Sequence, residues 1–583
     1  MARKINIITR VFVLSSLCLT MWGSIPHAYA TTARSTFTVT NTNNSGAGSL
    51  HQAIINANTN VGFDTIQFNI PFSDLGYYPS ADLFLIDLDG PLQDLSDPNG
   101  VWIDGTTQPT AEVDDIPNIW ITASDWPTAP HIFMIPSGST TNILQGLMLM
   151  NTDGDVVKID GSSNWINNCV IDGSKSGNGI SIMMNASGNT ITDNFIYGNK
   201  GDGININSSN GNHILRNEIG VGPDYITNAE PNEGDGINCL GSNENEISEN
   251  VINDNQGDGI QFTLCEDNEI TDNFIGGNLG SGLYCSACND NLIQGNVIGL
   301  SDVDYSAYGN SNYGVLMENR STGNDIFENF ISGNAWDGIR LIGSDTSENV
   351  IESNSIGYGY SGGFIPNGQH GIGIYDGADT NWVGNFSSMV GANRIGGNGW
   401  SGVAVVGMGS HNNYIYHNYI LSNQWYGIHV NNSPVNNIGN NVIHFNGLHG
   451  THAGVRIEGT SGHDNGITRN SIHSNTGLGI ELVDGGNGMM DPPLLYAADC
   501  HSVTGTACAD CMIEIYSDDE YEGEFFEGQA YADGSGNFTY SNPSVCFHGP
   551  NITAIAINGW ETSPFALPRV GVCMHFYLPM IVK

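Results

Sequence analysis

Three consecutive stretches of the chain align without a gap: GINCLGSNENEISENVINDNQGD at 236–258, GIQFTLCEDNEITDNFIGGNLGS at 259–281 and GLYCSACNDNLIQGNVIG at 282–299. Each stretch begins with a glycine, and successive glycines are 23 residues apart. Isoleucines recur at two fixed distances from that glycine, at Ile247, Ile270 and Ile293 and again at Ile252, Ile275 and Ile298. A fixed short period of this kind indicates a solenoid, in which each repeat forms one coil that stacks on the next.

The coil glycine recurs along most of the chain. Thirteen coils are predicted to begin at Gly154, Gly179, Gly203, Gly236, Gly259, Gly282, Gly314, Gly338, Gly371, Gly402, Gly427, Gly454 and Gly479. The first and third residues after the glycine are apolar or cysteine, as in Ile260 and Phe262, whereas the second and fourth vary. This alternation predicts β-strands with the apolar side chains inside. We therefore predict an all-β parallel β-helix over residues 151–495, about 60 Å long at ~4.8 Å per coil.

Asparagine forms a second repeated feature of the coils. The recurring asparagines stand two residues before the third-strand isoleucine, at Asn194, Asn217, Asn250, Asn273, Asn296, Asn329, Asn354, Asn418, Asn441 and Asn470. An inward amide can bond its equivalents in the coils above and below, so we predict a structural ladder. Three coils carry inserts, at 222–233, 301–311 and 357–369. All three follow the third strand, so they should project from one corner, either as binding loops or as decoration.

The coil pattern resembles that of bacterial secreted right-handed β-helix repeat proteins. The resemblance rests on alternating N-x-x-I and G-[IV]-x-[IV] segments, on N-x-I-G openings at 217–220, 296–299 and 354–357, and on a segment at 37–66 like the N-terminal cap of these proteins. It covers most of residues 36–495 and implies a right-handed parallel β-helix of about 13 regular coils, preceded by irregular ones. The same fold carries lyases, hydrolases, epimerases, adhesins and phage-type fibres, so the resemblance specifies fold better than function.

The two ends of the chain differ from the repeats. Residues 1–30 read as a secretory leader, with a basic start, an apolar run at 11–25 and an Ala28-Tyr29-Ala30 cleavage site. Export to the cell surface or the medium is therefore expected. No later stretch reaches the ~20 apolar residues of a membrane helix. Residues 31–150 should form the cap and first irregular coils, with a helix at 50–57 that begins after Ser49.

Beyond residue 495 the coil pattern stops. Residues 496–570 alternate like strands with turns between them, and they resemble the small immunoglobulin-like β-sandwich that often follows such helices. The apolar tail at 571–583 is either a sorting or attachment signal or a last strand.

The charge of the chain limits its partners. Removal of the leader leaves 12 basic and 60 acidic residues, a net charge of −48. Nucleic acid would be repelled, and so would polyanionic glycans unless a cation intervened. The oligomeric state has no signature in the sequence.

Ten cysteines remain after the leader, and we interpret them as structural. Cys265 and Cys288 both lie six residues past a coil glycine, so they should stack within disulfide range. Residues at one equivalent position of successive coils form a column. Cys239 and Cys285 belong to another column, in which Phe262 lies between them, so they should not pair. Cys500, Cys508, Cys511, Cys546 and Cys573 lie near or after the last coil, where disulfides are favoured over zinc or redox chemistry.

Two groups of acidic residues are candidate calcium sites. Asp202, Asp235 and Asp258 precede the glycine in three successive coils, where stacked carboxylates would repel one another unless a cation intervened. The simpler interpretation is that aspartate is favoured in a Gly-Asp-Gly turn. The acidic loop with Asp518, Asp519 and Glu520 is the second candidate.

A column of aromatic residues marks a candidate ligand-binding edge. Trp336, Trp400 and Trp425 stand two residues before a coil glycine, Tyr426 adjoins, and Tyr375 occupies a nearby outward position. Exposed rings at ~5 Å steps offer apolar faces to successive sugar rings. The alternative is that these rings pack over neighbouring turns.

Beside that edge the outward positions carry the candidate catalytic residues Arg340, His429, Arg456, Glu458 and Glu481. Glu458 or Glu481 would act as acid and the other as base or nucleophile in a glycoside hydrolase. Alternatively, Arg456 or His429 would abstract a proton in a lyase. The simplest interpretation is a solvated polar face with ordinary ion pairs.

One enzyme resemblance fails when it is extended. Residues 151–154, NTDG, look like the first motif of polygalacturonases, but the Asp pair, Gly-His-Gly and Arg-Ile-Lys expected to follow are missing. The sequence therefore favours an extracellular glycan-binding or adhesin-like scaffold. A polysaccharide lyase or glycoside hydrolase on the outer face is the second hypothesis, and a purely structural surface element is the third. No cofactor motif is present, and Ca²⁺ is the one ion the pattern suggests.

Overall fold

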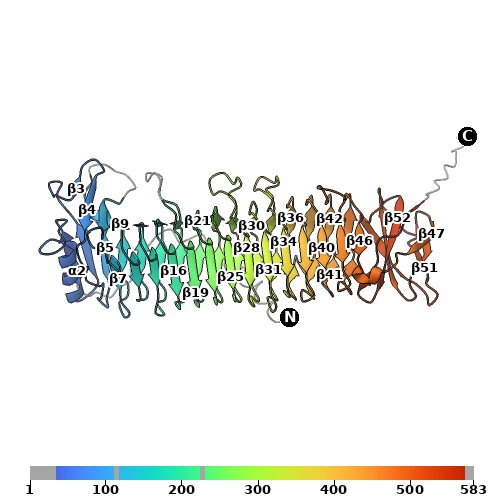
Figure 1. Ribbon diagram of the computed structural model, residues 1–583, viewed down its shortest axis with the longest axis horizontal. Coiled ribbons are helices and arrows are strands. Elements are labelled where there is room, and N and C mark those ends of the chain that lie inside the picture. Colours follow the sequence, from blue (N-terminus) through green and yellow to red (C-terminus); the bar gives the residue numbers. More distant parts are fainter. Residues whose placement is uncertain (1–33, 111–116, 224–229, 572–583) are drawn as a thin grey trace, which may run out of the picture.

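The computed structural model describes residues 34–110, 117–223 and 230–571. The predicted leader and all of the predicted tail but Gly571 lie outside these residues. The described chain forms a straight rod with a short helix at one end and a small β-domain at the other (Figure 1).

Three long sheets run the length of the rod through the described residues, and all their strands pair in parallel except β3, which pairs antiparallel with β4. Sheet 1 has 14 strands, which are β7 (Phe133–Ile135), β10 (Val157–Ile159), β13 (Ile180–Ile182), β16 (Ile204–Asn207), β19 (Ile237–Leu240), β22 (Ile260–Thr263), β25 (Leu283–Ser286), β28 (Val315–Glu318), β31 (Ile339–Ile342), β34 (Ile372–Tyr375), β37 (Val403–Val406), β40 (Ile428–Asn431), β43 (Val455–Glu458) and β46 (Ile480–Val483). Sheet 2 has 16 strands, which are β1 (Thr36–Val39), β2 (Asp64–Phe68), β5 (Val101–Asp104), β8 (Ile143–Gln145), β11 (Trp165–Asn167), β14 (Thr190–Thr192), β17 (His213–Leu215), β20 (Glu246–Ser248), β23 (Glu269–Thr271), β26 (Leu292–Gln294), β29 (Asp325–Phe327), β32 (Val350–Glu352), β35 (Trp382–Val383), β38 (Tyr414–Tyr416), β41 (Asn437–Gly439) and β44 (Gly466–Thr468). Sheet 3 also has 16 strands, which are β3 (Tyr77–Tyr78), β4 (Leu83–Asp87), β6 (Ile119–Thr122), β9 (Leu147–Met150), β12 (Val170–Asp172), β15 (Phe195–Tyr197), β18 (Glu218–Ile219), β21 (Val251–Asn253), β24 (Phe274–Gly276), β27 (Val297–Ile298), β30 (Phe330–Ile331), β33 (Ser355–Ile356), β36 (Arg394–Gly396), β39 (Tyr419–Leu421), β42 (Val442–His444) and β45 (Ser471–His473).

Each regular coil gives one strand to each sheet, and equivalent residues pair in register. Ile237, Ile260 and Leu283 are successive partners in sheet 1, as the repeat predicts. The parallel β-helix is thus confirmed. The first coil needs a correction, because Val157 pairs with Ile180. Val156, two residues after the predicted Gly154, therefore occupies the glycine position.

The interior is built from the first and third residues after each coil glycine. Ile260 and Phe262 are fully buried, like their equivalents along the rod. The glycine itself is needed for close stacking: a Cβ on Gly259 would lie 2.4 Å from Cγ2 of Ile275 and 2.7 Å from the carbonyl oxygen of Gly282. A side chain there would push adjacent coils apart, since interiors are close-packed.

Asparagine ladders join the coils at the turns. In the predicted ladder, Asn250 donates from its backbone nitrogen and from Nδ2 to Oδ1 of Asn273, at 2.9 and 3.0 Å, and from Nδ2 to the carbonyl oxygen of Ile214. Asn393 also belongs to this ladder. Two further ladders were not predicted; they run through the turns from Asn142 to Asn487 and from Asn199 to Asn475. Each turn therefore satisfies its buried backbone groups through the next coil.

The N-terminal end of the rod is closed by α2 (Leu50–Thr59). Ser49 caps it, because the Ser49 side chain accepts a hydrogen bond from the Gln52 nitrogen at 3.2 Å. Its buried stripe of Leu50, Ala53, Ile54 and Ala57 faces the first strands of sheet 2. The predicted helix is thus confirmed, and it shields the open strand edge of the first coil. A 3-10 turn, η1 (Gly105–Thr107), follows in the irregular coils.

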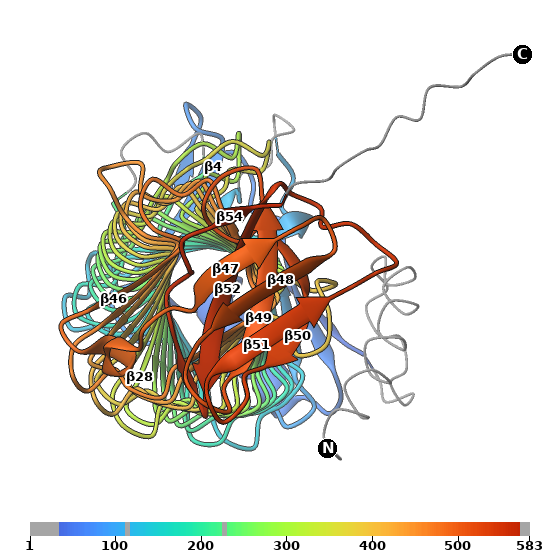
Figure 2. The same cartoon turned by 90° about the vertical axis from the view of Figure 1, so that its right-hand side faces the viewer.

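The C-terminal end is closed by a small antiparallel domain (Figure 2). After η2 (Gly486–Met489), one sheet contains β47 (Leu494–Ala498), β48 (Ser502–Thr506) and β51 (Asn537–Ser541), and the other contains β49 (Met512–Asp518), β50 (Phe525–Tyr531), β52 (Asn551–Asn558), β53 (Glu561–Thr562) and β54 (Arg569–Val570). Gly523 and Ile472 exchange two backbone hydrogen bonds, at 3.0 and 2.8 Å, so the domain continues the last coil's pairing. That this domain is immunoglobulin-like remains a prediction.

The three inserts follow β18, β27 and β33, so they leave the same corner of the rod, as Figure 1 shows. Residues 224–229 of the first insert lie outside the described residues. The other two inserts touch one another through Tyr305 and Tyr360, whose rings stack at 4.4 Å. Among the described helices, none is long and apolar enough to cross a membrane.

Candidate functional site

The outer surface of sheet 1 collects most of the predicted site residues. Parallel register places Arg340, Gly373, Ala404, His429, Arg456 and Glu481 in one outward row. Tyr375, Val406, Asn431 and Glu458 form the neighbouring row. We call the outer surface of β28 to β46, with the turns that precede these strands, the aromatic–arginine face.

One half of this face is an ion-pair network centred on Arg456. Its Nε lies 2.9 Å from Oε2 of Glu458, and its Nη1 lies 2.9 Å from Oε2 of Glu481. His429 Nε2 lies 3.2 Å from the same Glu458 oxygen. The guanidinium carbon lies 5.2 Å from the ring centroid of Tyr426. These five residues form the Arg456 cluster. In this cluster 19% of the Arg456 side chain and 32% of the Glu481 side chain are exposed.

The electrostatics of the Arg456 cluster fix its protonation. Burial raises the pKa of Glu458, but hydrogen bonds from Arg456 and His429 outweigh it and hold the pKa below the ordinary value. Burial lowers the pKa of His429 in spite of its contact with Glu458, so the imidazole is neutral near pH 7. Burial lowers the pKa of Arg456, but the hydrogen bonds to Glu458 and Glu481 outweigh burial and raise the pKa above its ordinary value. This guanidinium therefore stays charged. Arg456 is therefore a poor proton acceptor, and Glu458 is a poor general acid.

The other half of the face is centred on Arg340. Its guanidinium carbon lies 3.9 Å from the ring centroid of Tyr375 and 5.2 Å from that of Tyr313. Its Nη1 lies 3.4 Å from Oδ2 of Asp337, a carboxylate whose side chain is fully buried. Trp336 stands edge-on to Tyr313 with 4.9 Å between centroids. These five residues form the Arg340 cluster.

Asp337 is the most perturbed acid of the face. Burial raises its pKa to about 6, although a hydrogen bond from the His370 nitrogen and the charge of Arg340 both lower it. His370 is itself buried, and burial lowers its pKa to about 3 with help from His429 and Arg340. Its Nδ1 accepts a hydrogen bond from the Ser401 nitrogen at 3.2 Å, which leaves the proton on Nε2.

Trp400 and Trp425 join the two clusters, but not as an open platform. Their rings lie parallel, 7° apart, with centroids 5.1 Å apart, and His452 continues the stack at 6.1 Å from Trp425. The facing sides of the two rings therefore cover one another. Trp336 is the most exposed of the three tryptophans, with 41% of its surface accessible.

The structure thus brings His429, Arg456, Glu458, Glu481 and Tyr426 together, and it places Arg340, Tyr375 and Trp336 in a second group on the same face. Four neighbours were missed by sequence reasoning: Tyr313, Asp337, His370 and His452. They occupy the two turn columns that also hold Asp258 and Trp400. They are found when each column is followed through every coil, whatever residue type it holds.

The predicted calcium column does not converge on one point. Asp258 donates from its backbone nitrogen to Oδ1 of Asp235, and Asp235 does the same to Asp202, at 2.7 and 2.9 Å. Each carboxylate thus caps the next coil, and the first and third are two strand spacings apart, about 10 Å. Desolvation and its neighbour Asp202 raise the pKa of Asp235 to about 7. The arrangement fits the turn interpretation.

The acidic residues of the end-domain loop differ in their exposure. Asp518 is buried, whereas Asp519 and Glu520 point to solvent. The Asp518 carboxylate accepts a hydrogen bond from the Glu522 nitrogen at 2.6 Å, and burial raises its pKa to about 6. These three side chains do not face a common centre.

The predicted Cys265–Cys288 disulfide is not formed, and both thiols are buried and free. Side chains of in-register parallel neighbours point the same way, so their Cβ atoms stay near the ~4.8 Å strand spacing, beyond ordinary disulfide reach. Cys265 Sγ instead lies 3.0 Å from Cys239 Sγ in the preceding coil. In the end domain, where disulfides were expected but their pairing was not predicted, Cys508 and Cys511 form a disulfide, whereas Cys500 and Cys546 are not disulfide-bonded to each other.

The fold and this face define a β-helix protein with a polar and aromatic outer surface on one sheet. The sequence model of the right handed beta helix region matches residues 131–298, 224–329 and 313–490. These ranges cover more than half of the chain, which therefore belongs to the right-handed β-helix family.

Solved structures that the chain matches include the Dettilon tailspike protein, at 13% identity and a TM-score of 0.43, with 88% of this chain and 87% of that chain covered. PfbA, a surface adhesin of Streptococcus pneumoniae, matches at 11% identity and a TM-score of 0.34, covering 85% and 94%. The A-module of a mannuronan C-5 epimerase from Azotobacter vinelandii matches at 13% identity and 0.32, covering 77% and 98%. No match to a curated protein is found.

Proposed function

We propose that this protein is an extracellular or cell-surface scaffold that binds glycans through the aromatic–arginine face. The observation that carries the proposal is the Arg456 cluster, in which one guanidinium holds two carboxylates beside a tyrosine ring. Such paired groups are rigid and partly exposed, so they present fixed donors and acceptors to sugar hydroxyls, while the ring supplies apolar contact. The predicted leader supports export.

The charge of the face favours neutral glycans. Arg340 and Arg456 each have carboxylate partners, so neither offers an unbalanced positive charge. The chain as a whole is strongly acidic, with 60 acidic against 15 basic residues. An anionic polymer would therefore be repelled at long range and would find no excess cation at the surface.

A second candidate function, a polysaccharide lyase or glycoside hydrolase, is favoured by one observation. Asp337 has a pKa raised to about 6 by burial, as a general acid requires, and it lies beside Arg340. The scaffold is preferred because both exposed carboxylates, Glu458 and Glu481, are already bound to one arginine. A catalytic pair needs one protonated and one free carboxyl group.

The test of the binding face is a screen of neutral and anionic oligosaccharides on the chain from residue 31, without the predicted leader. Binding should fall at least tenfold in Tyr426→Ala and in Arg456→Lys, since lysine cannot bridge two carboxylates in the same plane. Arg216→Ala is the matched control, because Arg216 pairs with Asp193 at a turn between sheets 2 and 3. Equal losses in the control, or unchanged binding in both face variants, would locate the site elsewhere.

A further inference from the structure

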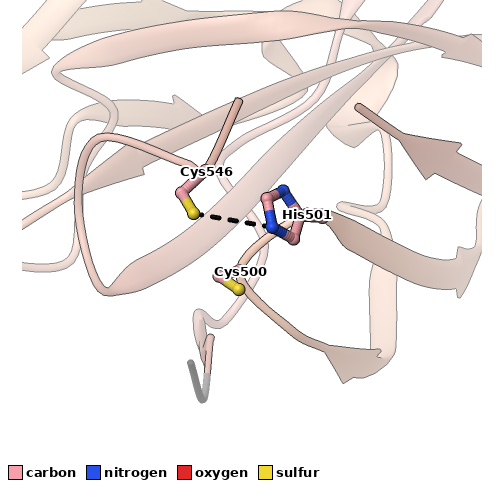
Figure 3. Close-up of side chains that lie close together, drawn as sticks. All are labelled: Cys500, His501 and Cys546. Atoms are coloured by element: carbon pink, nitrogen blue, oxygen red, sulfur yellow. Dashed lines mark hydrogen bonds between the residues drawn. The ribbon is translucent and has the colours of Figure 1, made fainter. Parts of the chain in front are cut away.

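The end domain contains a second cluster of reactive side chains, remote from the aromatic–arginine face. Cys500 follows β47, His501 precedes β48, and Cys546 lies in the loop between β51 and β52 (Figure 3). The two sulfur atoms and a ring nitrogen of His501 all lie within 4.8 Å of one another. Residues about 45 positions apart in the chain are therefore brought to one point by the fold of the domain.

Backbone hydrogen bonds hold these two segments together. The Phe547 nitrogen donates to the Cys500 carbonyl at 2.9 Å, and the Asn542 nitrogen donates to that of His501 at 2.8 Å. Asp499 Oδ1 accepts from the nitrogens of His501 and Ser502, at 2.8 and 2.7 Å, and so fixes the turn that carries Cys500 and His501. The site is preorganised by main-chain contacts that need no ion.

The tautomer of His501 is fixed in the form that a metal needs. Its Nδ1 lies 3.2 Å from the carbonyl oxygens of both Asn542 and Val545. A carbonyl oxygen only accepts, so Nδ1 carries the ring proton, and Nε2 keeps a free lone pair. That lone pair is directed to the side of the ring where Cys546 Sγ lies, 3.6 Å away. Metal-bound histidines commonly donate their second nitrogen to a backbone carbonyl in this way.

The donor set suits zinc, and the 3.6 Å between Cys546 Sγ and His501 Nε2 fits one pair of its ligands. Zinc binds thiolate at ~2.3 Å and imidazole at ~2.0–2.1 Å in tetrahedral geometry, which places sulfur and nitrogen ligands about 3.6 Å apart. We propose that Cys500, His501 and Cys546 bind a zinc ion. Binding displaces one proton from each thiol, and the two thiolates neutralise the ion. A water molecule or a further ligand completes the coordination.

Bound at this point, zinc would tie the loop before β52 to the turn between β47 and β48. The role is structural, because no group of the aromatic–arginine face contributes to the cluster. The same two sulfurs offer a competing chemistry in an exported protein, namely disulfide formation. A disulfide between the two cysteines would not involve the imidazole of His501, whereas zinc would bind it as a ligand.

The first experiment measures metal content. The chain from residue 31 is purified under reducing conditions, supplied with Zn²⁺ or Co²⁺ and desalted. Its metal content is then measured by elemental mass spectrometry, and the cobalt form is examined by absorption spectroscopy. We expect one ion per chain, and the absorption bands of tetrahedral thiolate-bound cobalt. Cys500→Ser, His501→Ala and Cys546→Ser should each weaken binding at least tenfold. Cys169→Ser, a buried cysteine of the solenoid, and His548→Ala, in the same domain, should bind as the parent does.

Two further readouts separate zinc from a disulfide and from misfolding. Cys500 and Cys546 should become reactive to iodoacetamide after a chelator alone, and the chelator should lower the Tm of the parent but not of Cys546→Ser. The proposal is overturned if peptide mapping of the exported protein finds either cysteine in a disulfide. It is equally overturned if reduced protein binds no zinc, or if the three variants bind it as tightly as the parent.

Discussion

At the scale of single residues, column position decides what each side chain does. Aspartate before the coil glycine points its carboxylate at the next backbone nitrogen, as Asp235 does to Asp258 at 2.7 Å. The same position in other coils holds Tyr313, Asp337, His370 and Tyr426, which supply much of the aromatic–arginine face. One turn column therefore links coils through aspartates, including Asp337, whose carboxylate accepts from the His370 nitrogen at 2.8 Å, and in the second half of the rod it also supplies surface groups.

The stacked aspartates give the protein a predictable pH dependence. Burial and Asp202 raise the pKa of Asp235 to about 7, so between about pH 4 and 7 the folded state binds more protons than the unfolded state. Stability should therefore fall as pH rises through that window. Asp235→Asn keeps the acceptor oxygen without the charge, and it should stabilise the protein by roughly 2 kcal/mol at pH 8 and by little at pH 4.

Thermal unfolding at both pH values checks this prediction. Asp267→Asn, at an exposed turn on another side of the coil, is the matched control and should change little at either pH. If Asp235→Asn gained nothing over the parent at pH 8, the carboxylate would be ionised without cost, and a cation bound at the column would become the better explanation.

At the scale of the element, each coil depends on the asparagines of its neighbours. Asn273 accepts hydrogen bonds from the backbone nitrogen and from Nδ2 of Asn250, at 2.9 and 3.0 Å, and donates from its own Nδ2 to Asn296 and to the carbonyl of Ile247. All of these groups are buried, so they have no water to replace a lost partner.

Asn273→Ala should destabilise the protein by about 3 kcal/mol, because it leaves a buried donor and a buried carbonyl without partners. The outward-facing Asn205 on β16 offers the control, and Asn205→Ala should cost less than about 0.5 kcal/mol. The difference is read from urea unfolding midpoints. Equal midpoints for the two variants would mean that the ladder does not contribute to stability.

The elements of the coil were predictable, and the contacts between surface residues were not. The apolar alternation around Ile260 and Phe262 requires an inward strand face, and the helix after Ser49 follows from its cap and stripe. The site was harder, because outward residues carry no periodic signal. Asp337 is an aspartate before a coil glycine, as Asp258 is, but it stands apart from Asp202, Asp235 and Asp258 in their three successive coils. His370 differs in chemistry, and only register shows that it shares this column. The disulfide prediction failed because equal column position gives parallel side chains, not facing ones.

At the scale of the whole molecule, both ends of the solenoid are covered. The helix α2 closes the first coil, and the end domain pairs with the last through Gly523 and Ile472 and through Thr562, whose Oγ1 accepts from the Ile467 nitrogen at 2.9 Å. An uncovered end would present three strand edges with unpaired backbone groups, which invite association.

A chain that ends at residue 491 should therefore self-associate more than the full chain. Sedimentation velocity over a range of concentrations would show species larger than any formed by the full chain, with unchanged β content by circular dichroism. The opposite finding, identical sedimentation of both chains at every concentration, would show that the end domain has no capping role.

The aromatic–arginine face is proposed to bind glycan without cleaving it. The most direct measurement incubates a glycan that binds with the parent protein and follows both binding and the release of reducing or unsaturated ends, with and without calcium. We predict saturable binding, lost in Tyr426→Ala, and no release of new ends in any condition. The opposite result is that the parent releases ends and that Glu458→Gln or Asp337→Asn abolishes this release. It would contradict the proposed non-catalytic binding and identify the protein as an enzyme.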